Sequence, residues 1–369
     1  MRSRHLVLVC GVAVLATLGG SSALASAGSG AHMTTVVSGL DNPRDLAFSP
    51  SGRLFVAEAG HGGSRCLDAN TCVGFTSKIS LVQIGTGRVR RVVTGLFSLA
   101  SKDGSGATGV DGISVLGRSS IYGIETGARD FIPPNAFTAG FRARVRGQIG
   151  QLLKASVNGS WSRVADVGHR DFVWSSNHPN LVPGQFPDAN PYGVLASRST
   201  QWVVDAGSNT LDRVDAGGRV HVVAFLPNPP SSDAVPTCVD RGPDGALYIG
   251  QLTGGGNAPG AASVWRYAPG EAHPLTRWAT GLTAVTGCGF DRHGRFFAVE
   301  LSTNGLDNAS PGTGAVVRVP PHSSSPVMVI GGLSFPGGFA AGPDGALYVS
   351  DWSVAPSSAH VGAVVRITL

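Results

Sequence analysis

Short apolar runs, separated by turns rich in Gly and Pro, recur along this chain and predict a protein built mainly of β-strands. One run occurs six times. It consists of an aromatic residue, two small or aliphatic residues, and a polar residue that is acidic in five copies. The copies begin at Phe55, Tyr122, Trp202, Tyr248, Phe297 and Tyr348, which are 67, 80, 46, 49 and 51 residues apart. A repeat of about 50 residues with four short strands is typical of a β-propeller blade.

The two ends of the chain complement each other. Most copies finish with a fourth strand, as in 89–96, 274–282 and 326–333, but the sixth copy stops after its third strand, 363–369. A matching strand, 34–40, precedes the first copy. We therefore expect an all-β, six-bladed β-propeller that is closed by the N-terminal strand completing the last blade, which leaves no exposed sheet edge between blades. An open β-sandwich or two small β-domains is the alternative.

The first 27 residues have the features of a secretory signal peptide. Arg2 and Arg4 precede an apolar stretch, 6–18, and small residues at 23–27 offer cleavage sites. The stretch is too short to span a membrane comfortably. We expect an exported protein, secreted or extracytoplasmic, whose residues 28–369 form one domain and a monomer.

Charge and motifs exclude several functions. Loss of the two arginines lowers the formal net charge from +5 to +3, and the basic residues are scattered, which disfavours a nucleic-acid partner. The chain has no Gly-x-Ser-x-Gly elbow, no His-Glu-x-x-His motif and no phosphate-binding loop. No catalytic activity is therefore indicated by motif.

Four cysteines remain after export, which permits disulfides. Cys66 and Cys72 flank the segment 67–71 within a Gly-rich loop, and we expect them to form a disulfide; metal ligation is the alternative. Cys238 and Cys288 begin the inner strands of neighbouring blades. They form either a bridge between these blades or two buried thiols.

Long connections gather at one end of the predicted ring. Strand alternation places the segments 60–76, 99–109, 127–147, 168–190, 253–261, 302–313 and 353–358 at the end where the inner strands begin, and only short turns at the other end. Because binding residues concentrate on loops held by a rigid scaffold, we expect the functional face there. Loops that merely shield the channel are the alternative.

The residues at the starts of the inner strands are candidates for a site at the channel mouth. They are Arg44, Asp45, Asp111, Tyr192, Thr237 and Thr286. Asp45 and Asp111 come from neighbouring blades and could hold Ca²⁺ together with carbonyl and amide oxygens. The alternative is that they pair with Arg44 and cap turns.

Two insertions add further candidates. His169, Trp174 and His178 belong to an inter-blade loop and could stack on a ligand or hydrogen-bond to it. The blade-two insertion carries Phe131, Phe137, Phe141 and the basic run 142–146, which could bind a ligand or, as the alternative, form a small core and a solvated strand face.

An acidic or amide residue ends each second strand. These residues are Glu58, Glu125, Asp205, Gln251, Glu300 and Asp351. Since they repeat, we expect them to serve blade construction by accepting backbone N–H bonds. We also expect cross-strand ion pairs with basic residues on the third strands, namely Lys154, Arg213, Arg266, Arg318 and Arg366.

Several segments resemble the ScyD/ScyE family. They are 41–60, 107–109, 188–193, 203–207, 248–253 and 302–305, together with the Cys66 and Cys72 pair. The resemblance runs through the mature chain and implies an exported propeller similar to NHL-repeat and lactonase-type rings. It implies no agreed activity, cofactor or catalytic residue. Cys238, Cys288 and the stretch 169–178 depart from the family pattern.

We expect a binding module that takes a small molecule, a glycan or a protein on the loop-rich face. A Ca²⁺-assisted hydrolase of the lactonase or esterase type is the alternative if the protein is an enzyme. Against it, the Glu-Gly-Pro signature of lactonase-type inner strands is replaced by Asn42-Pro-Arg44. A structural envelope protein is the third possibility.

Overall fold

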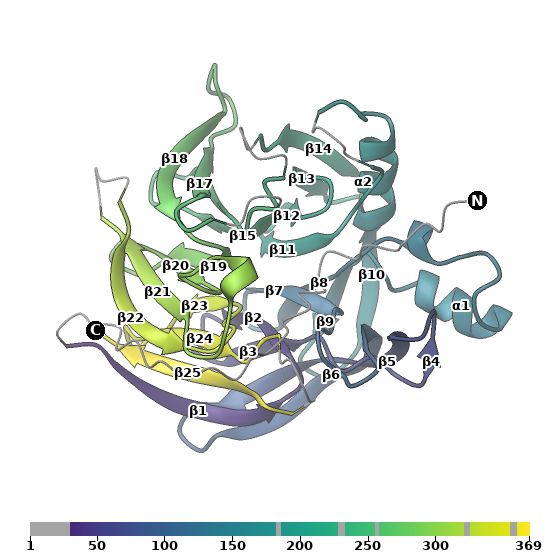
Figure 1. Ribbon diagram of the computed structural model, residues 1–369, viewed down its shortest axis with the longest axis horizontal. Coiled ribbons are helices and arrows are strands. Elements are labelled where there is room, and N and C mark those ends of the chain that lie inside the picture. The colour runs from purple at the N-terminus through teal and green to yellow at the C-terminus, as the bar shows by residue number, and fades with distance from the viewer. Residues whose placement is uncertain (1–29, 182–185, 228–232, 255–257, 321–324, 355–359) are drawn as a thin grey trace.

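The computed structural model describes residues 30–369 except 182–185, 228–232, 255–257, 321–324 and 355–359. Six antiparallel sheets surround a central axis as the blades of a propeller (Figure 1). The predicted fold class is therefore confirmed. The predicted signal peptide, 1–27, lies outside the described residues.

Each blade runs from an inner strand to an outer strand. Blade one contains β2 (Pro43–Phe48), β3 (Leu54–Glu58), β5 (Thr71–Gln83) and β6 (Arg88–Ser101), with the short β4 (Arg65–Cys66) beside β5. Blade two contains β7 (Val110–Leu116), β8 (Ser120–Glu125), β9 (Gln151–Ser156) and β10 (Trp161–Asp166). Blade three contains β11 (Pro191–Ala196), β12 (Thr200–Asp205), β13 (Thr210–Asp215) and β14 (Val220–Phe225).

The second half of the ring repeats this order. Blade four contains β15 (Pro236–Arg241), β16 (Leu247–Gln251), β17 (Ala262–Tyr267) and β18 (Leu275–Leu282). Blade five contains β19 (Val285–Phe290), β20 (Phe296–Glu300), β21 (Gly314–Val319) and β22 (Val327–Leu333). Blade six contains β23 (Phe339–Ala341), β24 (Leu347–Asp351), β25 (Gly362–Thr368) and, as its outer strand, β1 (His32–Leu40).

The ends of the chain close the ring as predicted. β1 pairs antiparallel with β25 from His32 opposite Thr368 to Leu40 opposite Gly362. Figure 1 shows the two strands side by side although they lie at opposite ends of the sequence. Val37 and Leu40 are buried in a cluster that includes Leu46 of blade one. The closing strand thus joins the last blade to the first through both hydrogen bonds and apolar contacts.

Neighbouring blades are also joined by side-chain hydroxyl groups near the start of their inner strands. Thr126 donates to the Pro191 carbonyl at 2.8 Å, and Thr237 donates to the Val285 carbonyl at 2.7 Å. The hydroxyl groups of Thr286 and Ser350 donate to carbonyls of the neighbouring blade in the same way, and the Ser77 oxygen accepts from the Val110 amide of blade two at 3.0 Å. Such bonds satisfy buried carbonyl and amide groups at the junctions where no β-ladder runs.

The long connections contain structure that the sequence pattern did not reveal. In blade one the β5–β6 ladder continues to Thr71 opposite Ser101, where two loops were expected. The basic run 142–146 belongs to helix α1 (Ala139–Arg146), not to a strand, and 3₁₀ helix η1 (Arg129–Phe131) precedes it. The stretch 167–176 is helix α2, Val167–Ser176, whose first turn is capped by the Asp166 carboxylate accepting from the His169 amide at 3.2 Å. A short 3₁₀ helix, η2 (Leu306–Asn308), follows β20.

The aromatic residues of the blade-two insertion form the expected alternative, a small core. Phe141 lies edge-on to Phe75 and Phe137, with ring centroids 5.3 and 5.0 Å away. Arg144 of α1 lies over the Phe75 ring at 3.6 Å. These side chains order the insertion against the extended β5–β6 hairpin.

The expected ion pairs between second and third strands are wrong. The basic residues stand opposite the aromatic residue that begins the second strand, as Arg266 does opposite Tyr248, and not opposite the acid that ends it. The acid is three residues further along, so it lies at the other end of the strand. Arg266 and Arg366 instead bind Asp244 and Asp344 of the preceding turns, each at 2.8 Å.

The acidic residues cap the segments that enter the blades, as expected. The backbone amides of Asp41, Asn190, Thr283 and Ser334 donate to Glu58, Asp205, Glu300 and Asp351 at 2.7–2.8 Å. In blade four the Gln251 side chain accepts from the Trp265 indole N–H at 2.6 Å. The acidic and amide residues that end the second strands therefore stabilise the blades, with one exception, Glu125 of blade two, which is described below.

The predicted Cys66–Cys72 disulfide is present, and of the two alternatives for Cys238 and Cys288 the structure has the bridge. Cys66 and Cys72 are bonded within blade one, and Cys238 and Cys288 are bonded between blades four and five. Among the residues that the structure describes, no helix is long and apolar enough to cross a membrane.

Candidate functional site

A cavity of about 230 Å³ lies on the propeller axis. It is lined by the inner strand of every blade: 44–48 of β2, Asp111, Ile113 and Ser114 of β7, 192–195 of β11, 237–240 of β15, Thr286 and 288–290 of β19, and 338–341 from the start of β23. The lining runs from the first residues of these strands, at the loop-rich end, to their last residues, at the end with the short turns. It is the described pocket that fits the predicted channel.

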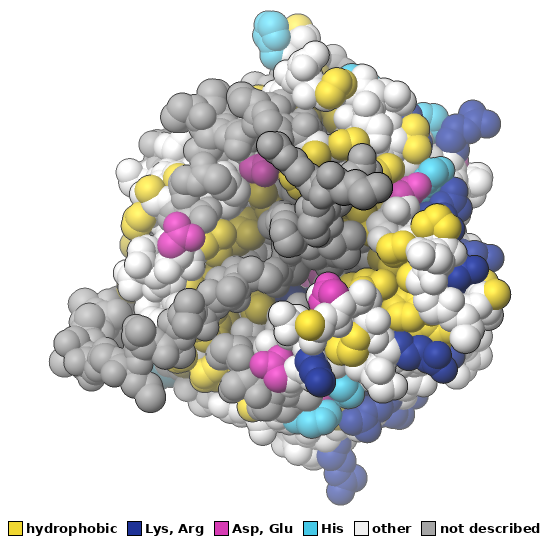
Figure 2. All heavy atoms as spheres, turned by 45° about the vertical axis from the view of Figure 1, so that its right-hand side comes forward, with side chains coloured by type: hydrophobic (Ala, Val, Ile, Leu, Met, Phe, Trp, Pro, Cys, Tyr) yellow, Lys and Arg dark blue, Asp and Glu magenta, His cyan; other side chains and the backbone are white. Residues whose placement is uncertain are grey.

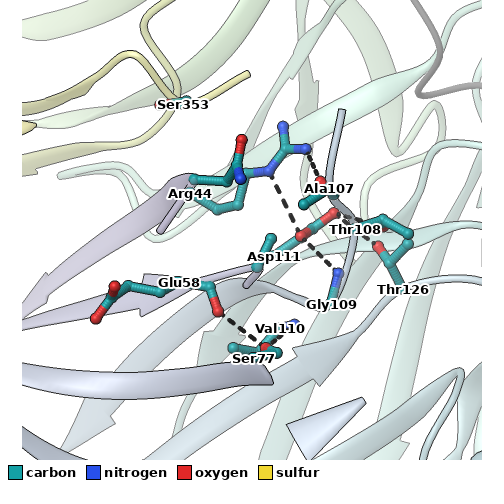
Figure 3. Close-up of polar contacts among 12 residues, drawn as sticks. Arg44, Glu58, Ser77, Ala107, Thr108, Gly109, Val110, Asp111, Thr126 and Ser353 are labelled. Atoms are coloured by element: carbon teal, nitrogen blue, oxygen red, sulfur yellow. Dashed lines mark hydrogen bonds and ion pairs between the residues drawn. The ribbon is translucent and has the colours of Figure 1, made fainter. Parts of the chain in front are cut away.

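Arg44 and Asp111 form the polar centre of the cavity mouth. The Arg44 Nε lies 3.7 Å from Asp111 Oδ1, and both side chains are buried. Figure 3 shows the Arg44 guanidinium between Asp111 and the Ala107 carbonyl, to which it also donates. Asp111 accepts from the hydroxyl groups of Thr108 and Thr126 at 3.2 and 3.1 Å. Burial raises the pKa of Asp111, and the charge of Arg44 opposes this rise.

Asp45 and Asp240 bring two more carboxyl groups to the cavity wall. Asp45 accepts from the amides of Leu46 at 2.8 Å and Ile113 at 3.1 Å. Asp240 accepts from the Phe290 amide at 2.8 Å, so each carboxyl bridges to the next blade. Burial raises the pKa of Asp45 to about 7, and the charge of Asp240 adds to the rise. The cavity therefore contains an acid that can change protonation near neutral pH.

Asp45 and Asp111 each have their own set of partners. The Asp45 carboxyl binds backbone amides of β2 and β7, whereas the Asp111 carboxyl faces the Arg44 guanidinium. A cation shared by both would lie beside that guanidinium, which is itself a cation. The donors present therefore do not fit a shared Ca²⁺ site.

The structure brings six of the nine predicted site residues together. Arg44, Asp45, Asp111, Tyr192, Thr237 and Thr286 all line the axial cavity. Thr237 and Thr286 donate their hydroxyl groups to carbonyls of the following blades. They retain acceptor lone pairs toward the cavity but have no free donor.

The other three predicted residues lie elsewhere, on helix α2 and directly after it. His169 Nδ1 lies 2.8 Å from Asp130 Oδ2. The His178 ring stacks on Trp174 with centroids 4.3 Å apart. His169, Trp174 and His178 are absent from the described lining of the cavity. They belong to the connection between blades two and three.

Glu125 is a candidate that the sequence analysis treated as one more capping acid. It is fully buried, and neither of its oxygens has a hydrogen-bond partner among the described residues. Burial raises its pKa well above the ordinary value, and the charge of nearby Asp111 adds to this rise. No feature of the sequence distinguishes Glu125 from the capping acids. It differs in the structure, because the Thr108 amide, which precedes the inner strand of blade two, donates to the Leu99 carbonyl and not to Glu125.

A second group of buried carboxyls lies between α2 and blade three. Asp171, Asp205 and Asp212 are all fully buried, and each has at least one oxygen without a hydrogen-bond partner among the described residues. Burial raises the pKa of Asp171 well above its ordinary value, and the charges of Asp212 and Asp205 raise it further. The sequence analysis did not predict this grouping, because Asp205 and Asp212 lie 34 and 41 positions after Asp171 in the chain.

In Figure 2 most of the visible Lys and Arg side chains lie along the outer edge of the molecule, and Asp and Glu side chains lie nearer the centre of the view.

Comparison with known proteins shows the fold. No family model matches this chain, and no curated protein sequence matches it. A gluconolactonase from Xanthomonas campestris is similar with a TM-score of 0.54 at 10% identity, over 95% of this chain and 93% of that chain. A protein of unknown function from Bacteroides thetaiotaomicron is similar with a TM-score of 0.55 at 11% identity, over 92% of this chain and 76% of that one.

A third solved structure is described as an oxidoreductase of the glucose dehydrogenase type from Thermus thermophilus. It is similar with a TM-score of 0.51 at 15% identity, over 92% of this chain and all of that chain. At such identities the similarity establishes the six-bladed β-propeller alone. The functions of these neighbours differ, so the site must carry any functional conclusion.

Proposed function

We propose that this protein is an exported binding module that takes a small molecule into the axial cavity from its loop-rich end. The observation that carries the proposal is the cavity itself, to which all six inner strands contribute. Ligand sites are concave, largely apolar and equipped with a few fixed polar groups. The two disulfides support function in an oxidising compartment.

The lining favours a neutral or cationic ligand with a flat apolar part. Phe48, Phe290 and Phe339 supply aromatic surface, and Asp45 and Asp240 supply carboxyl groups. Arg44 does not offset these acids for a ligand, because its guanidinium already binds Asp111 and the Ala107 carbonyl. At about 230 Å³ the cavity is smaller than the ~300 Å³ lower bound of drug-sized sites, so the ligand is small.

Membership of the ScyD/ScyE family is part of this proposal. It is supported by the segments quoted above, which include the first blade and the cysteine pair of its loop. The resemblance supplies no activity, so the ligand is inferred from the cavity alone. A glycan or a protein on the surrounding loops would be a larger partner of the same face.

A hydrolase is the second candidate, and one observation favours it. The pKa of Asp45, about 7, suits a general acid or base that faces the cavity. We rank it second because the cavity lining among the described residues holds no activated nucleophile, and because the metal-binding pair expected for it does not fit. A lactone or ester assay in the presence and absence of chelator separates the two: turnover would defeat the binding-only proposal.

Native mass spectrometry of protein purified from its own host tests the proposal. We expect a retained small-molecule adduct on the wild type. The variant Ala341→Phe fills the cavity wall with a large side chain and should lose the adduct, whereas Ala272→Phe, in an exposed turn of blade four that does not line the cavity, should keep it. An adduct that survives Ala341→Phe places the ligand outside the cavity and contradicts the proposal.

A further inference from the structure

Three side chains meet where the ring closes, outside the axial cavity. Asp41 directly follows the closing strand β1, His61 follows β3 of blade one, and His360 precedes β25 of blade six. One ligand atom from each, a carboxylate oxygen or a ring nitrogen, lies within 4.8 Å of the other two. The two imidazole rings stand edge to face with centroids 5.6 Å apart.

Both imidazoles direct Nδ1 toward the same carboxylate. His61 Nδ1 lies 3.3 Å from Asp41 Oδ2, and His360 Nδ1 contacts Asp41 Oδ1. The Asp41 side chain is 1% exposed. The Asp41 carboxylate also contacts the Lys78 ammonium, and such a contact favours the ionised carboxylate, which is the form that binds metal ions.

The charged groups around the Asp41 carboxylate carry a net negative charge, which favours binding of a cation. Lys78 Nζ contacts Asp41 Oδ2 and lies 3.7 Å from Glu58 Oε2. Two carboxylates against one ammonium leave one formal negative charge. Lys78 occupies the Oδ2 side, so Oδ1 is the oxygen available to a metal ion that also binds the two histidines.

We propose that Asp41, His61 and His360 bind a first-row transition-metal ion, Zn²⁺ in the first place, which links the first and last blades at the closure seam. Two imidazole nitrogens and one carboxylate oxygen are donors that suit Zn²⁺. Ligands about 2.1 Å from a tetrahedral ion are about 3.4 Å apart, so small side-chain rotations bring this group to bonding distance.

The fourth coordination position faces solvent. The His360 side chain is 62% exposed and the His61 side chain 36% exposed, so water or an external ligand can reach an ion between them. Three protein ligands and one open position are the pattern of accessible zinc sites, in contrast to closed structural sites with four protein ligands.

The backbone holds two of the ligands in place. The His61 amide donates to Thr76 Oγ1 at 2.9 Å, and Thr76 Oγ1 donates to the Gly62 carbonyl at 2.9 Å. His360 has a φ of +72°, a left-handed conformation that costs free energy for any residue other than glycine. Such a conformation persists where the surroundings require the side chain at that position.

Metal titration of the untagged full chain, first treated with chelator, tests this proposal. Co²⁺ is the optical probe, because histidine and carboxylate ligation changes its visible spectrum, and Zn²⁺ is then used to displace it. We expect one Co²⁺ per chain and at least about tenfold weaker binding in His61→Ala and in His360→Ala. Zn²⁺ should raise the melting temperature of the wild type but not that of the double variant, which carries both His61→Ala and His360→Ala.

The control is His273→Ala, an exposed histidine in the turn before β18 at the opposite end of the ring. It should bind Co²⁺ as the wild type does. All three histidines are at least one third exposed, so their loss should leave the fold intact, which circular dichroism checks. Absence of saturable Co²⁺ binding by the wild type, or equal affinity in the double variant, would overturn the proposal.

Discussion

The Ser350 hydroxyl of blade six donates to the Arg44 carbonyl of blade one, across the seam where the two ends of the chain meet. The same Ser350 oxygen accepts from the Gly338 amide at 2.7 Å. One side chain thus bonds to a buried backbone group on each side of the seam, and these two groups also bond to each other, since the Gly338 amide donates to the Arg44 carbonyl at 2.9 Å. The pairing of β1 with β25 closes the ring at its outer edge. The Ser350 hydrogen bonds close the ring at its inner edge.

Ser350→Ala should therefore destabilise the protein although it removes a single atom. The variant removes two hydrogen bonds of the Ser350 hydroxyl, but the Gly338 amide still donates to the Arg44 carbonyl at 2.9 Å, so we expect a cost of about 0.5–1.5 kcal/mol of unfolding free energy. Urea unfolding followed by tryptophan fluorescence measures the change. Thr276→Ala, which removes a hydroxyl from an exposed position of β18, should change stability by less than about 0.5 kcal/mol. Equal effects of the two substitutions would show that the seam bond contributes nothing.

The two disulfides should differ in their contribution to stability. The Cys238–Cys288 bond spans 50 residues and joins two blades, whereas the Cys66–Cys72 bond spans 6 residues within one loop. In the chain-entropy description the loss of the first costs about 4 kcal/mol and the loss of the second about 2 kcal/mol. Paired Cys→Ser variants compared by thermal unfolding, both under oxidising conditions, test this order. A larger loss from the Cys66 and Cys72 variant would contradict it.

The fold was predictable because each blade carries the same short residue pattern, which recurs six times along the chain. Each copy pairs an aromatic residue with a polar residue three positions later, and the unmatched strands at the two ends could complete only one blade together. The roles of the capping acids were also predictable, since an acid or amide stands at the same place in every copy; Glu58 and Asp205 accept from backbone amides that lie 17 and 15 residues earlier in the chain. What failed was the cross-strand pairing, because register depends on loop lengths that the pattern does not specify.

The site was only partly predictable. Strand order alone placed Arg44 and Asp111 at one mouth, but their pairing depends on side-chain directions that a sequence does not reveal. The helical state of the stretch around His169 arises from packing against blade three and from the Asp166 cap. His61 and His360 lie 299 positions apart, and only closure of the ring brings them together. No local pattern carries such a relationship.

Stability should fall as the pH rises through neutrality. Burial raises the pKa of Asp45, Asp188 and Glu300 to about 7 and that of Asp351 to about 6. Between about pH 4 and 7 the folded protein therefore holds protons that the unfolded chain has released, and the unfolding free energy decreases with each step up in pH. We expect a loss of at least about 2 kcal/mol between pH 5 and pH 8.

Urea unfolding at a series of pH values measures this dependence. Groups whose pKa is lowered, such as Asp291 and Asp344, act in the opposite direction: their contribution is lost as the pH falls below about 4, so a stability maximum near pH 4–5 is expected. Glu300→Gln should flatten the slope between pH 5 and 8. A stability that is constant or rises over this range would contradict the raised pKa values.

Asp171→Asn should stabilise the protein at neutral pH. Asp171 is fully buried against Asp205 and Asp212, and both of its oxygens lack a donor among the described residues, so an ionised carboxylate there is opposed by burial and by two neighbouring acids. Asparagine keeps the shape, removes the charge and supplies N–H donors to those acids. We expect a gain of about 1–3 kcal/mol at pH 7.

The pH dependence of this gain identifies its cause. At pH 4 the Asp171 carboxyl of the wild type is protonated and can itself donate, so the difference between wild type and variant should shrink. Asp171→Ala, which removes the charge but also the hydrogen-bonding capacity and volume, should recover less stability than asparagine at pH 7. A loss of stability in Asp171→Asn, together with destabilisation of the wild type by chelator, would show that the three carboxylates hold a cation instead of sharing protons.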